Sequence, residues 1–425
     1  MKERIALSWK ALIVFFVISL VIPSAFQTAR GIFLAIIIFG SVVTLNVKKI
    51  SYNKTVITLF ILNMAASIFF ILIGFLNNSP GVLKVSTVYF VWPILFLYFV
   101  GFMNSTKVAP YFNYGIIAGG ILSCLLIINN ILNTFGYLSI TNNTIYEAIG
   151  FSVFWEGGFT KISSTNLVTV FCVYVLTLAI LFLPKPIRKT IYPKSAFVIF
   201  VMVLCVVLLF LSGRRAFWLV GMLSPVIIVL IYHFSGLQMN FKRHFIYLAI
   251  IFFISVFLFS YLAFDNDRFL QEFSSIFVFD DPSAESNLLR KEQYEALMQG
   301  WSISPIWGSG LGSATPGSIR DTIAPWNYEL SYIALLFQTG IVGVVIYTCS
   351  VLWIVFKSIQ LVRKNKDNAA ILLPLVCTMV SFLLANATNP YLAKFDYLWV
   401  IFLPVGIING ILVKQEKNKM RHAKI

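Results

Sequence analysis

Long apolar segments alternate with short polar ones along almost the whole chain. A membrane-spanning helix needs about 20 apolar residues, and by this measure the pattern predicts about 12 spans. They lie near residues 11–27, 31–46, 55–76, 86–103, 112–133, 164–184, 196–212, 216–232, 245–264, 329–356, 369–388 and 395–413. The first is predicted to be a span rather than a cleavable signal, because no small-residue cleavage site follows it.

The composition also indicates a membrane protein. Hydrophobic residues make up 59% of it and charged residues 11%, whereas soluble domains are about 45–50% apolar and about 25% charged. We therefore exclude a cytosolic enzyme or secreted domain and predict an all-α integral membrane protein. The formal charge of +16 arises from basic clusters between apolar segments, which indicates membrane topology rather than nucleic-acid binding.

The basic residues also predict the orientation. With the N-terminus in the cytoplasm, most of the 32 Lys and Arg fall inside, whereas of the acids only Glu3, Asp367 and Glu416 do. Both termini are then cytoplasmic. The two long loops, at residues 134–163 and 265–328, lie outside, and long loops with some structure of their own are usually functional. We expect the chemistry on the outer face.

This layout divides the chain into three parts: residues 1–264 with the first nine spans, the large, partly helical outer loop 265–328, and residues 329–425 with the last three spans and a basic tail. The five cysteines fall within spans, so disulfides are not expected. The three histidines, His233, His244 and His422, are all assigned to the cytoplasmic side. An outward-facing mechanism must then work without histidine.

The first candidate site is Ser212-Gly213-Arg214-Arg215, between the seventh and eighth spans. Arginines at the outer surface run against the positive-inside trend. They either snorkel to lipid headgroups or hold phosphate oxygens in a bidentate fork. Adjacent helical residues point about 100° apart, so at most one of the pair aims squarely into a cavity.

The second candidate is a predicted helix outside the bilayer, Ser283–Trp301. Asp280, Asp281, Pro282, Ser283 and Glu285 form its acidic start. One face carries Arg290, Tyr294, Leu297, Met298 and Trp301, and the opposite face Glu292, Glu295 and Gln299. An unpaired charge on the apolar face is costly, so Arg290 either pairs with an acid such as Glu329 or Asp265, or contacts a ligand. We favour the ligand.

The third candidate combines the glycine-rich segment 305–313 with Glu329. The glycine spacing is not a dinucleotide fingerprint, but it allows the backbone to approach a sugar or phosphate closely. Glu329 lies at the outer mouth of the tenth span, where a carboxylate without a role or partner is costly.

Nearby aromatic residues and acids give weaker signals. The aromatic residues are either sugar-stacking platforms or, as is commoner near an interface, membrane anchors; they are Tyr294, Trp301, Trp307, Trp326 and Tyr328. The outer acids lack the ligand spacing of a calcium loop; they are Asp265, Asp267, Asp280 and Asp281. We assign no metal and no cofactor.

The order of these motifs resembles the O-antigen ligase and polymerase superfamily, which includes WaaL-type ligases and Wzy-type polymerases. The matching features run from Ser212 to Gly343: a span ending in Ser-Gly-Arg-Arg, a loop arginine, Pro-x-x-Gly-x-Gly-x-Gly, and a polar residue eleven positions before Gly-x-x-Gly. The hydropathy layout of the whole chain agrees.

The resemblance implies an enzyme of the bacterial inner membrane that uses undecaprenyl-diphosphate-linked oligosaccharides on the periplasmic side, without nucleotide sugar or metal. Ligases transfer the glycan to lipid A-core, and polymerases transfer it to the next lipid-linked repeat unit, which makes that lipid both donor and acceptor. The resemblance also implies that the pyrophosphate is bound by Arg290 and by either Arg214 or Arg215. We add Tyr294, Gly310, Arg320 and Tyr332 as substrate-binding residues. Whether a chain-length regulator also binds is left open.

One departure from the family pattern is informative. Glu329 stands where ligases typically carry a histidine, which favours a polymerase, although a different register places Trp326-Asn327 at that position. Glu329 is then either the base that deprotonates an acceptor hydroxyl or a residue that positions an arginine. Direct attack by the acceptor inverts the anomeric centre.

Three other functions compete with this interpretation. A transporter or lipid flippase would place ionisable residues or broken helices near the bilayer midplane and show related halves. Neither is evident. A cell-wall polymerase of the shape, elongation, division and sporulation type fits the motif order less well. A scaffold protein would not explain an arginine on the apolar face of an external helix.

Overall fold

The computed structural model describes residues 2–23, 25–44, 50–102, 109–137, 143–156, 159–192, 194–238, 285–316 and 323–422. These residues form two compact units that interleave along the chain. The first takes its described residues from Met1–Ile50, Ser105–Ser274 and Ile359–Phe382, and the second from Ser51–Asn104, Ser275–Ser358 and Leu383–Ile425. The three-part division predicted above, with boundaries at residues 264 and 328, uses consecutive segments of the chain rather than compact units, and it stays a prediction.

The first unit is built from α-helices and one β-hairpin. Its helices are α1 (Lys2–Val21), α2 (Gln27–Thr44), α6 (Ala109–Thr134), α7 (Asn143–Ala148), α8 (Leu167–Phe182), α9 (Lys185–Lys189), α10 (Ser195–Leu211), α11 (Arg215–Phe234), the 3₁₀-helix η3 (Lys366–Asn368) and most of α16 (Ala369–Ala385). Its strands, β1 (Phe151–Glu156) and β2 (Phe159–Ser164), pair antiparallel with Phe151 opposite Ser164.

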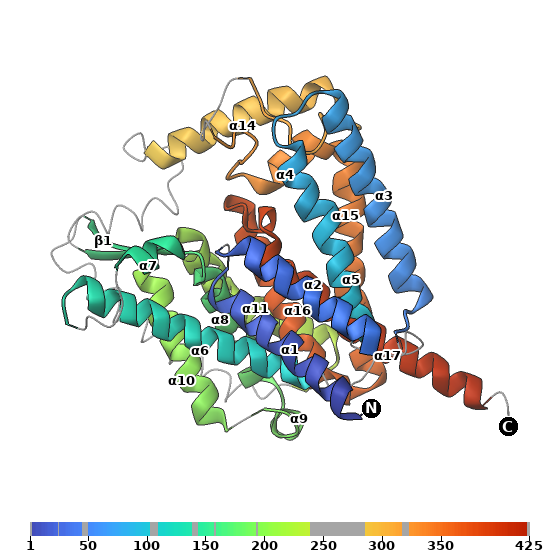
Figure 1. Ribbon diagram of the computed structural model, residues 1–425. Helices are drawn as coiled ribbons and strands as arrows, with labels where there is room; N and C mark the ends of the chain where they lie inside the picture. The colour runs from blue at the N-terminus through green and yellow to red at the C-terminus, as the bar shows by residue number, and fades with distance from the viewer. Residues whose placement is uncertain are drawn as a thin grey trace. The chain divides into compact units, whose positions relative to one another are not determined.

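The second unit contains the remaining described helices. They are α3 (Lys54–Leu76), α4 (Val82–Ser86), the π-helix η2 (Thr87–Val91), α5 (Trp92–Phe102), α14 (Glu285–Ile303), most of α15 (Ser331–Lys364), η4 (Asn386–Thr388), η5 (Tyr391–Ala393), η6 (Phe395–Tyr397) and α17 (Trp399–His422). In Figure 1, α14 runs across the ends of α3 and α15 rather than along them.

This architecture confirms the predicted fold class of an all-α membrane protein. Seven segments of the described chain are long and apolar enough to cross a membrane, and four shorter apolar helices accompany them. Each predicted span coincides with one or more of the observed helices, apart from 245–264, which lies outside the described residues. The predicted outer helix Ser283–Trp301 is observed as α14.

The core of the first unit is α8. A helix that is apolar on all sides must be enclosed, and every residue from Leu167 to Phe182 is buried. Helices α6, α10 and α11 pack against it. Small residues allow the closest approach: a Cβ on Gly120 of α6 would lie 2.4 Å from the Val173 side chain.

The hairpin was not predicted, because segment 134–163 was treated as a loop. Its sequence nevertheless carries a hairpin signal, since Gly157-Gly158 separates two segments rich in aromatic and β-branched residues. The hairpin packs against α6 and, through β2, against α10, which brings Ser163 to the end of the helix that precedes Arg214.

Candidate functional site

Arg290 and Glu329 form an ion pair in the second unit. Arg290 lies on α14 and Glu329 two residues before α15 begins, and Arg290 Nε is 2.8 Å from Glu329 Oε2. The side chains are 26% and 14% exposed, so the pair is shielded more than a surface salt bridge, and its Coulombic attraction is stronger. Of the two alternatives for Arg290, pairing with Glu329 is confirmed, and contact with a ligand stays a prediction.

A glutamine one turn along α14 holds the backbone of the same glutamate. Gln293 is 1% exposed, and its Oε1 accepts a hydrogen bond from the Glu329 N–H over 3.1 Å. Gln293 was not among the predicted site residues. Its spacing is a weak signal, because Gln293 lies three residues after Arg290 and four before Leu297, and therefore on the same helix face.

The buried face of α14 differs from the predicted one. Leu297 is fully buried and Gly300 packs against the Phe337 ring of α15. Tyr294, predicted on the face with Arg290, is 47% exposed. The predicted face was wrong at this position because Gln293, whose oxygen has a partner, occupies the buried side instead. Glu292, Glu295 and Gln299 are exposed, as expected.

Tyr328 is a structural residue of this cluster. It is 3% exposed and packs with Leu297, Ala334 and Phe337. Its hydroxyl oxygen accepts from the Thr315 N–H over 2.6 Å, and burial raises the pKa of the phenol. Tyr328 thereby links α14, the loop that follows the glycines and α15. Its burial excludes Tyr328 as an exposed sugar-stacking platform.

The glycine-rich segment lies against a break in α15. At Gly340 the backbone leaves the helical conformation, with φ 59° and ψ −171°. Four backbone hydrogen bonds of 2.9–3.2 Å join the segment to the break: Ser309 to Phe337, Gly310 to Gln338, Ile341 to Pro305 and Val342 to Ile306. Backbone groups released by a break in an apolar helix need such partners, and this segment supplies them.

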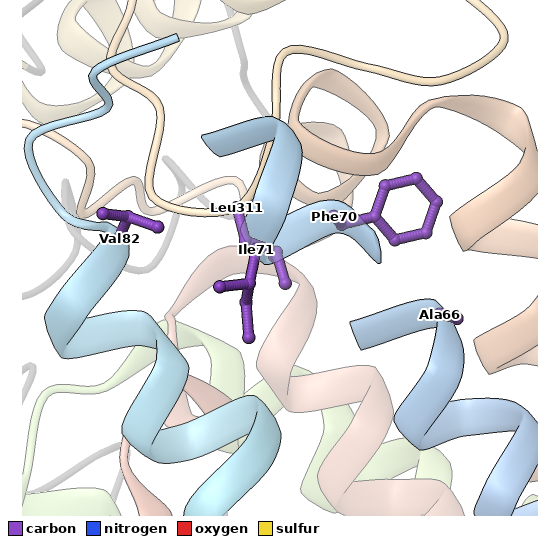
Figure 2. Close-up of a cluster of buried hydrophobic side chains, with 5 residues drawn as sticks. All are labelled: Ala66, Phe70, Ile71, Val82 and Leu311. Atoms are coloured by element: carbon purple, nitrogen blue, oxygen red, sulfur yellow. The ribbon is translucent and has the colours of Figure 1, made fainter. Parts of the chain in front are cut away.

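The same segment contacts the ends of α3 and α4. Leu311 is fully buried in a cluster with Ala66, Phe70, Ile71 and Val82 (Figure 2). A Cβ on Gly310 would lie 2.2 Å from the Gly74 nitrogen, and one on Gly312 2.4 Å from the Val82 nitrogen. The close approach predicted for a sugar or phosphate is thus made to the protein's own backbone. Gly310 as a substrate contact stays a prediction.

Alanine at Gly310 is expected to destabilise the protein severely. Gly310 has φ +94° and its Cβ would overlap the Gly74 backbone, which is rigid within α3. Gly136 is the matched control, because its φ is +77° and nothing lies within 4 Å of its Cβ. Gly136→Ala has only the cost of the left-handed conformation, roughly 1–2 kcal/mol. The measurement is thermal unfolding in detergent, and equal Tm values for the two variants would contradict the role assigned to the segment.

Arg214 and Arg215 lie at the start of α11 in the first unit. Gly213, with φ +62°, ends the turn after α10, Arg214 is the N-cap residue and Arg215 the first helical residue. Arg214 Nη2 donates to Ser163 Oγ over 3.4 Å, and Trp218 Nε1 donates to the Leu209 carbonyl over 2.9 Å. The N-terminal end of a helix carries a partial positive charge, so two arginine side chains there are electrostatically unfavourable. A bound anion would offset this repulsion.

The remaining predicted site residues have various environments. Tyr332 is 39% exposed and its hydroxyl donates to the Leu383 carbonyl. The Trp326 ring lies against Gly81, and Asn327 is exposed. Trp307 is 49% exposed and meets Phe69 edge to face. Arg320, Asp265, Asp267, Asp280 and Asp281 lie outside the described residues, and their roles stay predictions.

Comparison with known families agrees with the motif order. Residues 200–348 match the model of a family described as O-antigen ligase. This segment contains all the motifs from Ser212 to Gly343, so the resemblance to the O-antigen ligase and polymerase superfamily is confirmed. No curated protein matches the chain.

Proposed function

We propose, from the premise that residues 200–348 form an O-antigen ligase family domain, that the protein is a lipid-carrier-dependent glycosyltransferase. Its substrates are undecaprenyl-diphosphate-linked oligosaccharide repeat units, and its reaction is their polymerisation. The observation that carries the proposal is the Arg290–Glu329 pair, which lies at the end of a long apolar helix within the matched segment. A shielded cation and carboxylate side by side are the two groups that this transfer requires.

The cation serves the leaving group. As the bond from the anomeric carbon to the donor diphosphate breaks, negative charge develops on the diphosphate, and a guanidinium stabilises it. The Arg290 Nε now contacts Glu329 Oε2. Diphosphate oxygens have the same planar, bidentate preference for arginine as a carboxylate, so a bound donor competes with Glu329 for Arg290.

The carboxylate serves the acceptor. When Arg290 turns to the diphosphate, Glu329 loses its cation and can take the proton of the acceptor hydroxyl as that oxygen attacks the anomeric carbon. One bond forms to the acceptor oxygen, one breaks to the diphosphate, and the centre inverts. The other assignment, in which Glu329 only orients Arg290 for the donor, predicts different kinetics and is tested below.

The positions of the histidines support a polymerase over a ligase. His233 lies in the last turn of α11, whereas Arg215 begins it. At about 1.5 Å per residue, roughly 27 Å of helix separates them. His422 ends α17, and His244 lies outside the described residues. Ligase activity remains the second candidate, because the matched family is described as O-antigen ligase.

The proposal includes a location and partners. It places the protein in the bacterial inner membrane, with both termini in the cytoplasm and the Arg290–Glu329 pair on the periplasmic side. The lipid-linked oligosaccharide is donor and acceptor, and the bilayer is the other partner. The basic residues of the α17 tail, exposed at Lys414, Lys417 and Lys419, support the cytoplasmic C-terminus.

The test is a reconstitution. Purified protein is incubated with a lipid-diphosphate-linked repeat unit and no other acceptor, and the product is separated on a gel. We expect a ladder of lengthening chains. Transfer only after lipid A-core is added would identify a ligase instead. Neither product from a substrate that a known polymerase extends would overturn the proposal and favour a transporter.

A further inference from the structure

Gln293 is a side chain near the Arg290–Glu329 pair to which the proposed mechanism gives no role. We infer that Gln293 is a positioning residue for Glu329: it fixes the main chain of the glutamate so that the carboxylate is presented to Arg290 and to the acceptor. The inference rests on the proposed function, because it assigns a task only if the Arg290–Glu329 pair performs the transfer.

Helix α14 holds Glu329 at two points, one helical turn apart. Arg290 contacts the carboxylate, with 2.8 Å between Nε and Oε2, and Gln293 accepts from the backbone N–H over 3.1 Å. Residues three apart on a helix lie on the same face. One contact alone would let the glutamate rotate about its backbone, whereas two contacts from one rigid element determine both the main-chain and the side-chain position.

The burial of Gln293 is hard to explain by packing. Gln293 is 1% exposed and lies on the helix face that also buries Leu297. An apolar side chain at this position would be less costly to bury than an amide. Among the described residues, the Gln293 amide makes a single hydrogen bond, the one to Glu329. Burying a primary amide costs free energy that its hydrogen bonds must offset, so its position indicates that the contact with the Glu329 backbone matters.

The glutamate needs such a constraint because of where it lies. The first N–H groups of α15 have no partners within the helix and attract a carboxylate. Glu329 lies two residues before the helix begins, and the Ser331 N–H already bonds to the Glu329 carbonyl over 2.9 Å. If the Glu329 backbone were released, its side chain could turn to the helix end. The Gln293 contact favours the arrangement in which the carboxylate faces Arg290.

Three variants test the inference in the reconstituted ladder assay. Gln293→Leu keeps the volume and removes the acceptor, Gln293→Glu keeps an acceptor at the same reach, and Gln299→Leu, on the exposed side of the same helix, is the control. We expect Gln293→Leu to lower kcat roughly 10- to 100-fold, the cost of a misplaced catalytic group, with KM changed less than about threefold. Gln299→Leu should match the wild type.

Gln293→Glu separates positioning from packing. If Gln293 only fills space, leucine is the better replacement, because a buried carboxylate costs more than a buried isobutyl group. If it positions Glu329, the glutamate variant recovers part of the kcat that Gln293→Leu loses, since its oxygen still accepts from the Glu329 N–H although its charge competes for Arg290. Activity of the leucine variant equal to or above that of the glutamate variant would overturn the inference.

A double variant distinguishes failure of the inference from failure of the proposed function. In a Glu329→Gln background, Gln293→Leu should change the residual rate less than about twofold, because Gln293 acts through the missing carboxylate. An undiminished effect in that background contradicts the inference alone. Full activity of Glu329→Gln by itself contradicts the role given to Glu329, whereas the absence of a ladder from the wild type contradicts the proposed function.

Discussion

Alanine at Arg290 lowers the rate of glycan transfer roughly 100- to 1,000-fold, the usual loss when a group that stabilises developing negative charge is removed. The guanidinium contacts Glu329 now and would contact the donor diphosphate during the reaction. The measurement is the initial rate of ladder formation at saturating lipid-linked substrate. Lys291→Ala is the matched control, because Lys291 is the exposed cation next along α14 and should retain full activity.

The loss must be separated from instability. Arg290→Ala leaves the 14%-exposed Glu329 side chain without this partner, and a largely buried charge without its partner destabilises a fold. The neutral double variant Arg290→Met with Glu329→Gln should recover the Tm and not the activity. Recovery of both would show that the pair is structural, and full activity of Arg290→Ala would remove the diphosphate contact altogether.

Arg215→Ala is a parallel test in the other unit. The family resemblance assigns Arg214 or Arg215 to the pyrophosphate, and Arg214 already donates to Ser163. We expect Arg215→Ala, at the first residue of α11, to abolish activity while the protein still inserts and expresses normally. Lys185→Ala, at an exposed cation of α9 in the same unit, is the control. Full activity of Arg215→Ala would leave Arg214 as the arginine to test.

Hydropathy was sufficient to predict the long apolar helices, because the bilayer imposes a length and a composition on each of them. It was not sufficient at α15, which hydropathy treats as one continuous span. The break at Gly340 depends on hydrogen bonds from a segment some thirty residues earlier in the chain, and no local pattern contains that pairing. Gly308 and Gly340 serve one contact, although the sequence presents them as parts of separate motifs.

The site, too, could be predicted only in part, and the reason is similar. An arginine on an apolar helix face requires a partner, so Glu329 could be proposed from sequence as the acid that meets Arg290. The direction of the α14 face could not, because the i, i+4 spacing places Tyr294 with Arg290 and gives no reason to expect a buried glutamine at position 293. A buried polar residue can be recognised only when its partner is known, and here the partner is a backbone N–H.

Glutamine at Glu329 distinguishes the two roles left for this residue. The substitution keeps the volume and the backbone N–H that donates to Gln293, and it removes the ability to take a proton. If Glu329 is the base, kcat falls roughly 100- to 10,000-fold while KM for the lipid-linked substrate is nearly unchanged. If Glu329 only orients Arg290 for the donor, the glutamine amide oxygen still accepts from the guanidinium, so kcat at saturation is largely kept and the smaller loss falls on KM.

Trp326→Phe is the comparison that fixes the register of the motif. The Trp326 ring lies against Gly81 at the start of α4, a contact that a phenyl ring largely reproduces, so we expect a loss of less than about threefold, as for a volume-conserving swap. Glu329→Gln must therefore cost far more than Trp326→Phe. The reverse order would mean that Trp326-Asn327 occupies the position of the ligase histidine, and that the carboxylate beside Arg290 is structural.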